Sequence, residues 1–171
     1  MLPLLLLAAA LALSACYASN RLLLDPDTAA HPLDDGVYER SDAEHQRIRL
    51  SRTPDGWYSV EDVNANGTIG QTRRALFNDM PLGGLKAYAV AEETAEGWIY
   101  GVVVQANERV YLATPDCADP LDASVAVDHG GVQADDDAMT HNCLFKDRDA
   151  LIAALSAYAG QAEFGAPYLK K

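Results

Sequence analysis

The chain has 171 residues and a formal net charge of −12, with 13 Lys and Arg against 25 Asp and Glu. This balance argues against nucleic acid and against an anionic membrane surface as partners, because both need clustered Lys or Arg. Without an N-terminal leader, the length is that of a single domain with one sizeable core.

The chain begins with an apolar run over residues 2–13, followed by Ser14, Ala15 and Cys16. The run is about twelve residues long, whereas a membrane-spanning helix needs roughly 20. It therefore fits the hydrophobic region of a signal peptide. A plain secretory signal, in which Cys16 is incidental, remains the alternative.

The motif Leu13-Ser14-Ala15-Cys16 resembles the lipobox of bacterial lipoproteins. The resemblance implies that residues 1–15 are removed as a signal peptide and that the Cys16 thiol is acylated, for instance with palmitate. Several acyl chains would attach the protein stably to a membrane. Because Tyr17 rather than Asp follows the cysteine, the resemblance also implies a place in the cell envelope, at the outer membrane facing the periplasm.

Residues 16–35 are predicted to form a lipidated tether, because Pro26, Pro32 and several acids disfavour packing. The cluster Leu22-Leu23-Leu24 could instead dock on the folded domain. A single globular domain is expected over residues 36–171.

The first half of that domain predicts consecutive β-hairpins. Residues 47–51 alternate charged and apolar side chains, the period of a half-buried strand. Turn chemistry follows at residues 53–56, and Asn66-Gly67 marks a second hairpin turn. The most hydrophobic strand is expected at residues 98–104. These patterns predict an α+β fold with an antiparallel meander of about six or seven strands, whose closure into a barrel is left open.

One C-terminal helix is expected to cover this sheet. Asp147 is a suitable N-cap, and Asp149 in the first turn complements the positive helix end. Apolar residues then recur at helical spacing, at Leu151, Leu155 and Tyr158.

Residues 115–142 show no clear periodicity and predict a long acidic loop, with a short strand considered at residues 125–127. Cys117 and Cys143 lie at its ends. Once Cys16 is assigned to lipid, this even pair in an oxidising compartment predicts a disulfide. Closing a loop of about 26 residues contributes on the order of 3 kcal/mol. The alternative is a reactive thiol with His129 or His141 as its base.

Two acidic stretches could bind a cation. Asp62, Asn64 and Asn66 resemble the opening of an EF-hand calcium loop, but Arg73 stands where a bidentate Glu is required, so an Asn-Gly hairpin turn is the preferred interpretation. The second stretch offers carboxylates and imidazoles, which suit Ca²⁺, Zn²⁺ or Mn²⁺, although a solvated acidic loop is the simpler interpretation. Its residues are Asp128, His129, Asp135, Asp136, Asp137 and His141.

No serine-hydrolase, zinc-protease or phosphate-binding motif is present, so no catalytic residue is assigned and no cofactor other than Ca²⁺ is considered. The leading hypothesis is a non-catalytic lipoprotein module that binds a protein or envelope component through acidic residues 116–137, since charge of one sign steers basic partners. One alternative is a lipocalin-like carrier of a small apolar ligand inside a barrel, and another is a calcium-dependent adhesion or binding module. An interior cavity lined by Tyr, Val and Leu would favour the carrier.

Overall fold

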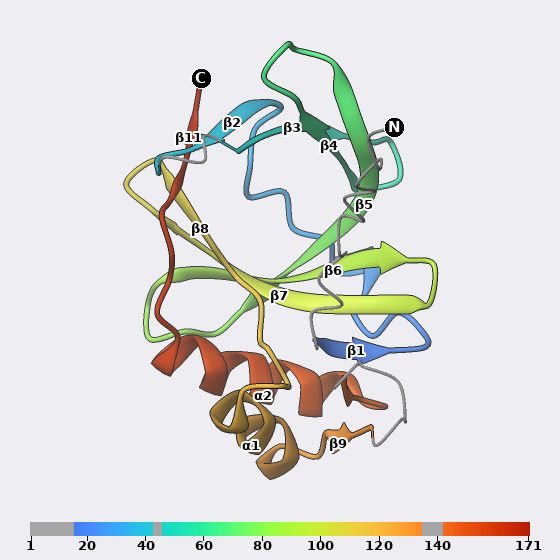
Figure 1. Cartoon of the computed structure of the whole chain (residues 1–171). Helices are drawn as coiled ribbons and strands as arrows, with labels where there is room; N and C mark the ends of the chain where they lie inside the picture. The colour runs from blue at the N-terminus through green and yellow to red at the C-terminus, as the bar shows by residue number, and fades with distance from the viewer. Residues whose placement is uncertain (1–15, 43–45, 135–141) are drawn as a thin grey trace, which may run out of the picture.

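The computed structural model describes residues 16–42, 46–134 and 142–171. In this part of the chain the fold is mostly antiparallel β-structure with two α-helices and one short 3-10 helix (Pro26–Thr28). Figure 1 shows the strands wound into a ring, with both α-helices gathered on one side of it. The strands of the ring are β2 (Gly36–Arg40), β3 (Arg47–Arg52), β4 (Tyr58–Val63), β5 (Ile69–Met80), β6 (Lys86–Thr94), β7 (Gly97–Ala106), β8 (Arg109–Ala113) and β11 (Tyr168–Lys170).

The ring is a closed barrel, in which each of these eight described strands pairs antiparallel with its neighbours. The closing strand is β11, where Tyr168 pairs with Arg40 of β2 on one side and with Val110 of β8 on the other. The predicted antiparallel meander is therefore confirmed. The structure also closes the meander into a barrel, which the sequence analysis left open.

The predicted hairpin turns are present. Thr53 N–H donates to the Trp57 carbonyl over 2.8 Å, and Gly56 between them has a φ of +84°. In the next turn, Asn64 N–H donates to the Thr68 carbonyl over 2.9 Å, and Gly67 has a φ of +82°. Glycine is suited to both places because other residues are strained at positive φ.

The predicted C-terminal helix is α2 (Arg148–Gln161), and its N-cap Asp147 accepts a hydrogen bond from Ala150 N–H over 3.0 Å. A further helix, α1 (Pro120–Asp128), lies in the segment that was expected to be an acidic loop, so residues 125–127 are helical and the strand considered there is wrong. Asp119 caps α1 and Pro120 opens it, a common helix start. No helix in the described ranges is long and apolar enough to cross a membrane.

The helices cover the outer face of β5, β6 and β7 (Figure 1). The outward side chains of β6 are small, because Ala87, Ala89 and Ala91 lie under this layer. Leu151 and Leu155 of α2 belong to the same cluster and are both 0 % exposed. This close-packed layer is the larger of two hydrophobic cores, and the second lies inside the barrel.

Residues 16–35 pack against the domain, so the expectation of a tether is wrong for this stretch. The short strand β1 (Tyr17–Ser19) pairs with β7 and with β10 (Cys143–Leu144), which in turn pairs with β9 (Val132–Gln133). Tyr17 is fully buried. Leu23 and Leu24 are also buried, as the docking alternative predicted, because they join the outer core.

Candidate functional site

The inner face of the barrel encloses a cavity of about 380 Å³, which we call the chamber. Because side chains alternate along a strand, every second residue of each barrel strand points inward. The strand registers put apolar side chains of several strands on this inner face. The apolar residues lining the chamber include Leu33, Ile48, Leu50, Val60, Phe77, Val90, Val103 and Val110.

One end of the chamber is plugged by Leu33, which is 5 % exposed. The Tyr58 hydroxyl donates to the Leu33 carbonyl over 2.7 Å and accepts from Leu33 N–H over 3.3 Å. The Tyr58 ring also meets the edge of Phe77, with centroids 5.1 Å apart. These contacts fix the plug in place and close this end of the barrel with apolar side chains.

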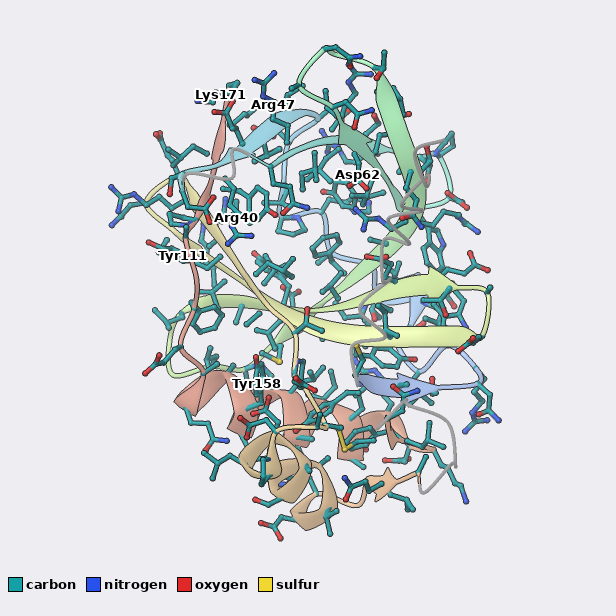
Figure 2. All side chains as sticks on the ribbon, viewed as in Figure 1. Arg40, Arg47, Asp62, Tyr111, Tyr158 and Lys171 are labelled. Atoms are coloured by element: carbon teal, nitrogen blue, oxygen red, sulfur yellow. A yellow bond between two sulfur atoms is a disulfide. The ribbon has the colours of Figure 1, made fainter. Side chains whose placement is uncertain are left out.

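The other end carries charged side chains on the inner face, and we call it the arginine end. Arg73 of β5 places Nη2 2.6 Å from Oδ1 of Asp62 on β4 and Nε 3.5 Å from Oε1 of Glu92 on β6. Arg40 of β2 also lines the chamber here. Figure 2 shows Arg40 and Asp62 directed into the space that the strands enclose.

Charges at the arginine end largely compensate one another. Burial raises the pKa of Glu92, while the nearby Arg73 guanidinium lowers it and Asp62 raises it further. The Arg73 Nε–H is buried and has no hydrogen-bond acceptor among the described residues. Its nearest acidic neighbour is Glu92 Oε1, 3.5 Å away in the ion pair.

The chamber reaches the surface at the arginine end. Thr114 and Gly165 line it and are exposed, and Leu112, which also lines it, is 46 % exposed. A ligand would therefore enter past an apolar lip at Leu112 and the charged side chains, with the Leu33 plug at the far end.

The residues of the candidate calcium loop are engaged elsewhere. Asp62 pairs with Arg73 inside the barrel. Asn64 donates to Thr68 Oγ1 over 2.9 Å, and Asn66 Oδ1 accepts from both the backbone and the hydroxyl of Thr68. The side chains thus serve different partners, and the contacts are those of the hairpin turn preferred from the sequence.

Cys117 and Cys143 form the predicted disulfide, with their Cα atoms 5.8 Å apart. The pair is therefore not a reactive thiol in this structure. Cys16, the residue expected to carry lipid, is 1 % exposed, and its carbonyl accepts a hydrogen bond from Cys143 N–H over 3.0 Å.

The acidic stretch is only partly within the described residues. Asp128 is exposed at the end of α1, whereas Asp135, Asp136 and Asp137 lie outside those residues, as does His141. Within the described ranges, no group of three or more His, Cys, Asp or Glu side chains is placed to hold a metal ion.

Sequence reasoning missed the polar residues of the chamber. For Arg40 a signal was present, because it lies two residues after Tyr38 and so shares the inner face of β2. For Arg73 there was none, because Arg74 follows directly and the strand pattern does not say which arginine points inward.

The chain matches no protein-family model, and comparisons with curated proteins and with solved structures give no match.

Proposed function

We propose that this protein binds a small, mostly apolar ligand in the chamber, as a carrier or ligand-binding module. The observation that carries the proposal is the cavity of about 380 Å³ inside the closed barrel. Eight-stranded barrels can either fill their interior with side chains or hold one small ligand, and ligand pockets commonly measure about 300–1,000 Å³.

The chemistry of the wall supports a ligand with two unlike parts. Leu50, Phe77 and Val103 offer an apolar surface in the deeper part of the chamber. Burying apolar ligand surface there contributes roughly 25 cal/mol per Å². At the arginine end, the charged side chains of Arg40, Arg73 and Glu92 line the chamber and favour a polar group. The ligand class is therefore an apolar body with a short polar end.

The test is titration with N-phenyl-1-naphthylamine, a neutral dye whose fluorescence rises when it leaves water. The purified protein should bind it saturably. Ala75 lines the chamber and is 3 % exposed, so Ala75→Phe should fill part of the space and abolish the fluorescence rise. Because the added ring enters an existing cavity, the variant should keep its melting temperature, whereas overpacking a solid core costs about 1–3 kcal/mol.

Thr72→Phe is the matched control, since Thr72 lies on the same strand but is exposed on its other face. It should bind the dye like the wild type. Absence of a saturable rise in the wild type, or equal binding by all three proteins, would contradict the chamber proposal. Mass spectrometry of an organic extract of the purified protein would identify any natural occupant.

We also propose that Cys16 anchors the protein in the cell envelope, on the lipobox resemblance. Because β1 begins at Tyr17 and residues 16–35 are packed, an anchored domain would lie directly at the membrane surface. Acylation needs the buried Cys16 thiol to turn outward. Cys16→Ser should abolish incorporation of labelled palmitate and release the protein from the membrane fraction, and retention of both would contradict the anchor.

A further inference from the structure

The sheet continues beyond the barrel at the mouth of the chamber. Along one edge of β7, β8 is paired as far as Val102, whose partner is Ala113, and β1 takes its place from Tyr100 toward the start of β7. β10 and β9 follow β1 in the sheet, and Figure 1 shows β1 and β9 beneath β7. We call β1, β10 and β9 the side sheet. It begins where β8 leaves the wall of the chamber.

One row of apolar side chains crosses the side sheet from the chamber wall. Ile99 of β7 lines the chamber and is paired with Ala18 of β1. Ala18 is paired with Leu144 of β10, and Leu144 is paired with Val132 of β9. Paired residues of neighbouring strands point to the same face of a sheet. The row therefore continues the inner face of the barrel outward, past the mouth of the chamber.

The outer part of this row is open to solvent. Leu144 is 40 % exposed and Val132 is 59 % exposed, whereas Ala18 is buried. Single exposed apolar residues are normal on a protein surface, whereas contiguous ones mark interaction sites, membranes included. Leu144 and Val132 are direct cross-strand neighbours. We call this pair the apolar edge.

The position of Cys16 indicates what the apolar edge contacts. Cys16 directly precedes β1, and its carbonyl accepts a hydrogen bond from Cys143 N–H over 3.0 Å. Its own N–H donates to Asn142 Oδ1 over 3.0 Å. The proposed attachment point of the acyl chains therefore lies beside the start of β10, where Leu144 follows Cys143. The described chain is packed from Cys16 onward, so an anchored domain holds the apolar edge close to the lipid.

Charge narrows the kind of membrane surface. The chain has a net charge of −12, which opposes an anionic lipid surface. Exposed Leu and Val side chains gain from leaving water whatever the charge of the headgroup, at roughly 25 cal/mol per Å². The surface that fits the apolar edge is therefore one of zwitterionic phospholipid.

We propose that the apolar edge seats on the surface of a zwitterionic phospholipid bilayer in which the acyl chains of Cys16 are embedded. The arginine end of the barrel then faces the bilayer, and the end closed by the Leu33 plug faces away from it. In this orientation the mouth of the chamber opens at the lipid surface. The orientation rests on the proposed anchor at Cys16 and does not depend on the chamber ligand.

The test is quenching of tryptophan fluorescence by phospholipids that carry bromine in their acyl chains. The acylated protein is reconstituted in phosphatidylcholine vesicles with and without the brominated lipid. Leu144→Trp and Val132→Trp each add one tryptophan at the apolar edge, over the same background of Trp57 and Trp98. Both variants should lose more emission to the brominated lipid than the wild type does, because the added ring enters the bilayer. Both should keep the wild-type melting temperature, because the replaced side chains are exposed.

Leu85→Trp is the matched control. Leu85 is 56 % exposed and directly precedes β6, at the end of that strand opposite to Glu92 and the arginine end. Its added tryptophan should not raise the quenching above that of the wild type.

Flotation of the vesicles separates the two proposals. Protein that does not float with the vesicles would contradict the anchor and, with it, this orientation. Protein that floats would overturn the orientation alone if the brominated lipid quenched all three variants equally, or quenched none of them more than the wild type.

Discussion

The sheet of β5, β6 and β7 is close-packed on its outer face and hollow on its inner face. On β6 the outward Ala87, Ala89 and Ala91 are 4 %, 0 % and 0 % exposed beneath the helices. The inward Val90 and Glu92 on the same strand line the chamber. One strand thus takes part in a solid core and in a cavity wall.

On β6, side-chain size does not explain the hollow. The alanines of β6 are on the packed face, where they let the helices approach, and the larger Val90 and Glu92 face the chamber. Protein interiors are normally packed as densely as organic crystals, with few voids larger than a water molecule. The chamber beside such a layer is the observation on which the proposed function rests.

The sharpest way to test the comparison is to remove the same atoms from each core. Leu155 on α2 and Leu50 on β3 are 0 % and 3 % exposed. Leu155→Ala should lower the free energy of unfolding by about 2–5 kcal/mol. Leu50→Ala should lower the free energy of unfolding by less. Leu50 borders the chamber, so its side chain contacts fewer atoms and loses fewer contacts when it is truncated. Urea unfolding of both variants measures this, and equal losses would contradict a hollow inner core.

The disulfide allows the packed layer to be weakened alone. Cys117 precedes α1 and Cys143 lies in β10, so the disulfide belongs to the packed layer outside the barrel. Cys117→Ser/Cys143→Ser should lower the free energy of unfolding by about 3 kcal/mol. Dye binding in the chamber, measured below the new melting temperature, should persist. Loss of dye binding by the folded variant would show that the two cores are not independent.

Local sequence signals were sufficient for much of this fold. The residues of the turns at Gly56 and Gly67 impose a reversal by themselves, and Asp147 with the apolar spacing after it specifies α2. The disulfide followed from cysteine number and compartment. In each of these cases the determining residues are close in sequence or few in number.

Closure of the barrel was beyond such signals. It depends on β11, a strand of three residues that shows no readable period and pairs with β2 and β8 from a great sequence distance. The helix α1 was missed although Asp119-Pro120 is a helix start, because Asp and Pro also signal loops. The chamber follows from closure, so it was not predictable as a located site.

The smallest expected effect concerns the pH response of the hollow core. Burial raises the pKa of Glu92 above its ordinary value of 4.5. Between that value and the higher pKa of the folded state, the folded chain binds more protons than the unfolded chain. The contribution of Glu92 to stability is therefore complete at low pH and is lost as the pH rises through the folded pKa.

Glu92→Gln cannot undergo this loss, so its stability should improve relative to the wild type as the pH rises above 4.5, the ordinary pKa of the glutamate side chain. Urea unfolding at several pH values measures the difference, with Glu93→Gln as control. Glu93 is the next residue but lies on the outer face, 46 % exposed and 3.6 Å from Arg74. Parallel pH profiles for the wild type and Glu92→Gln would mean that Glu92 is well solvated. The arginine end would then be a water-filled opening rather than part of a desolvated ligand site.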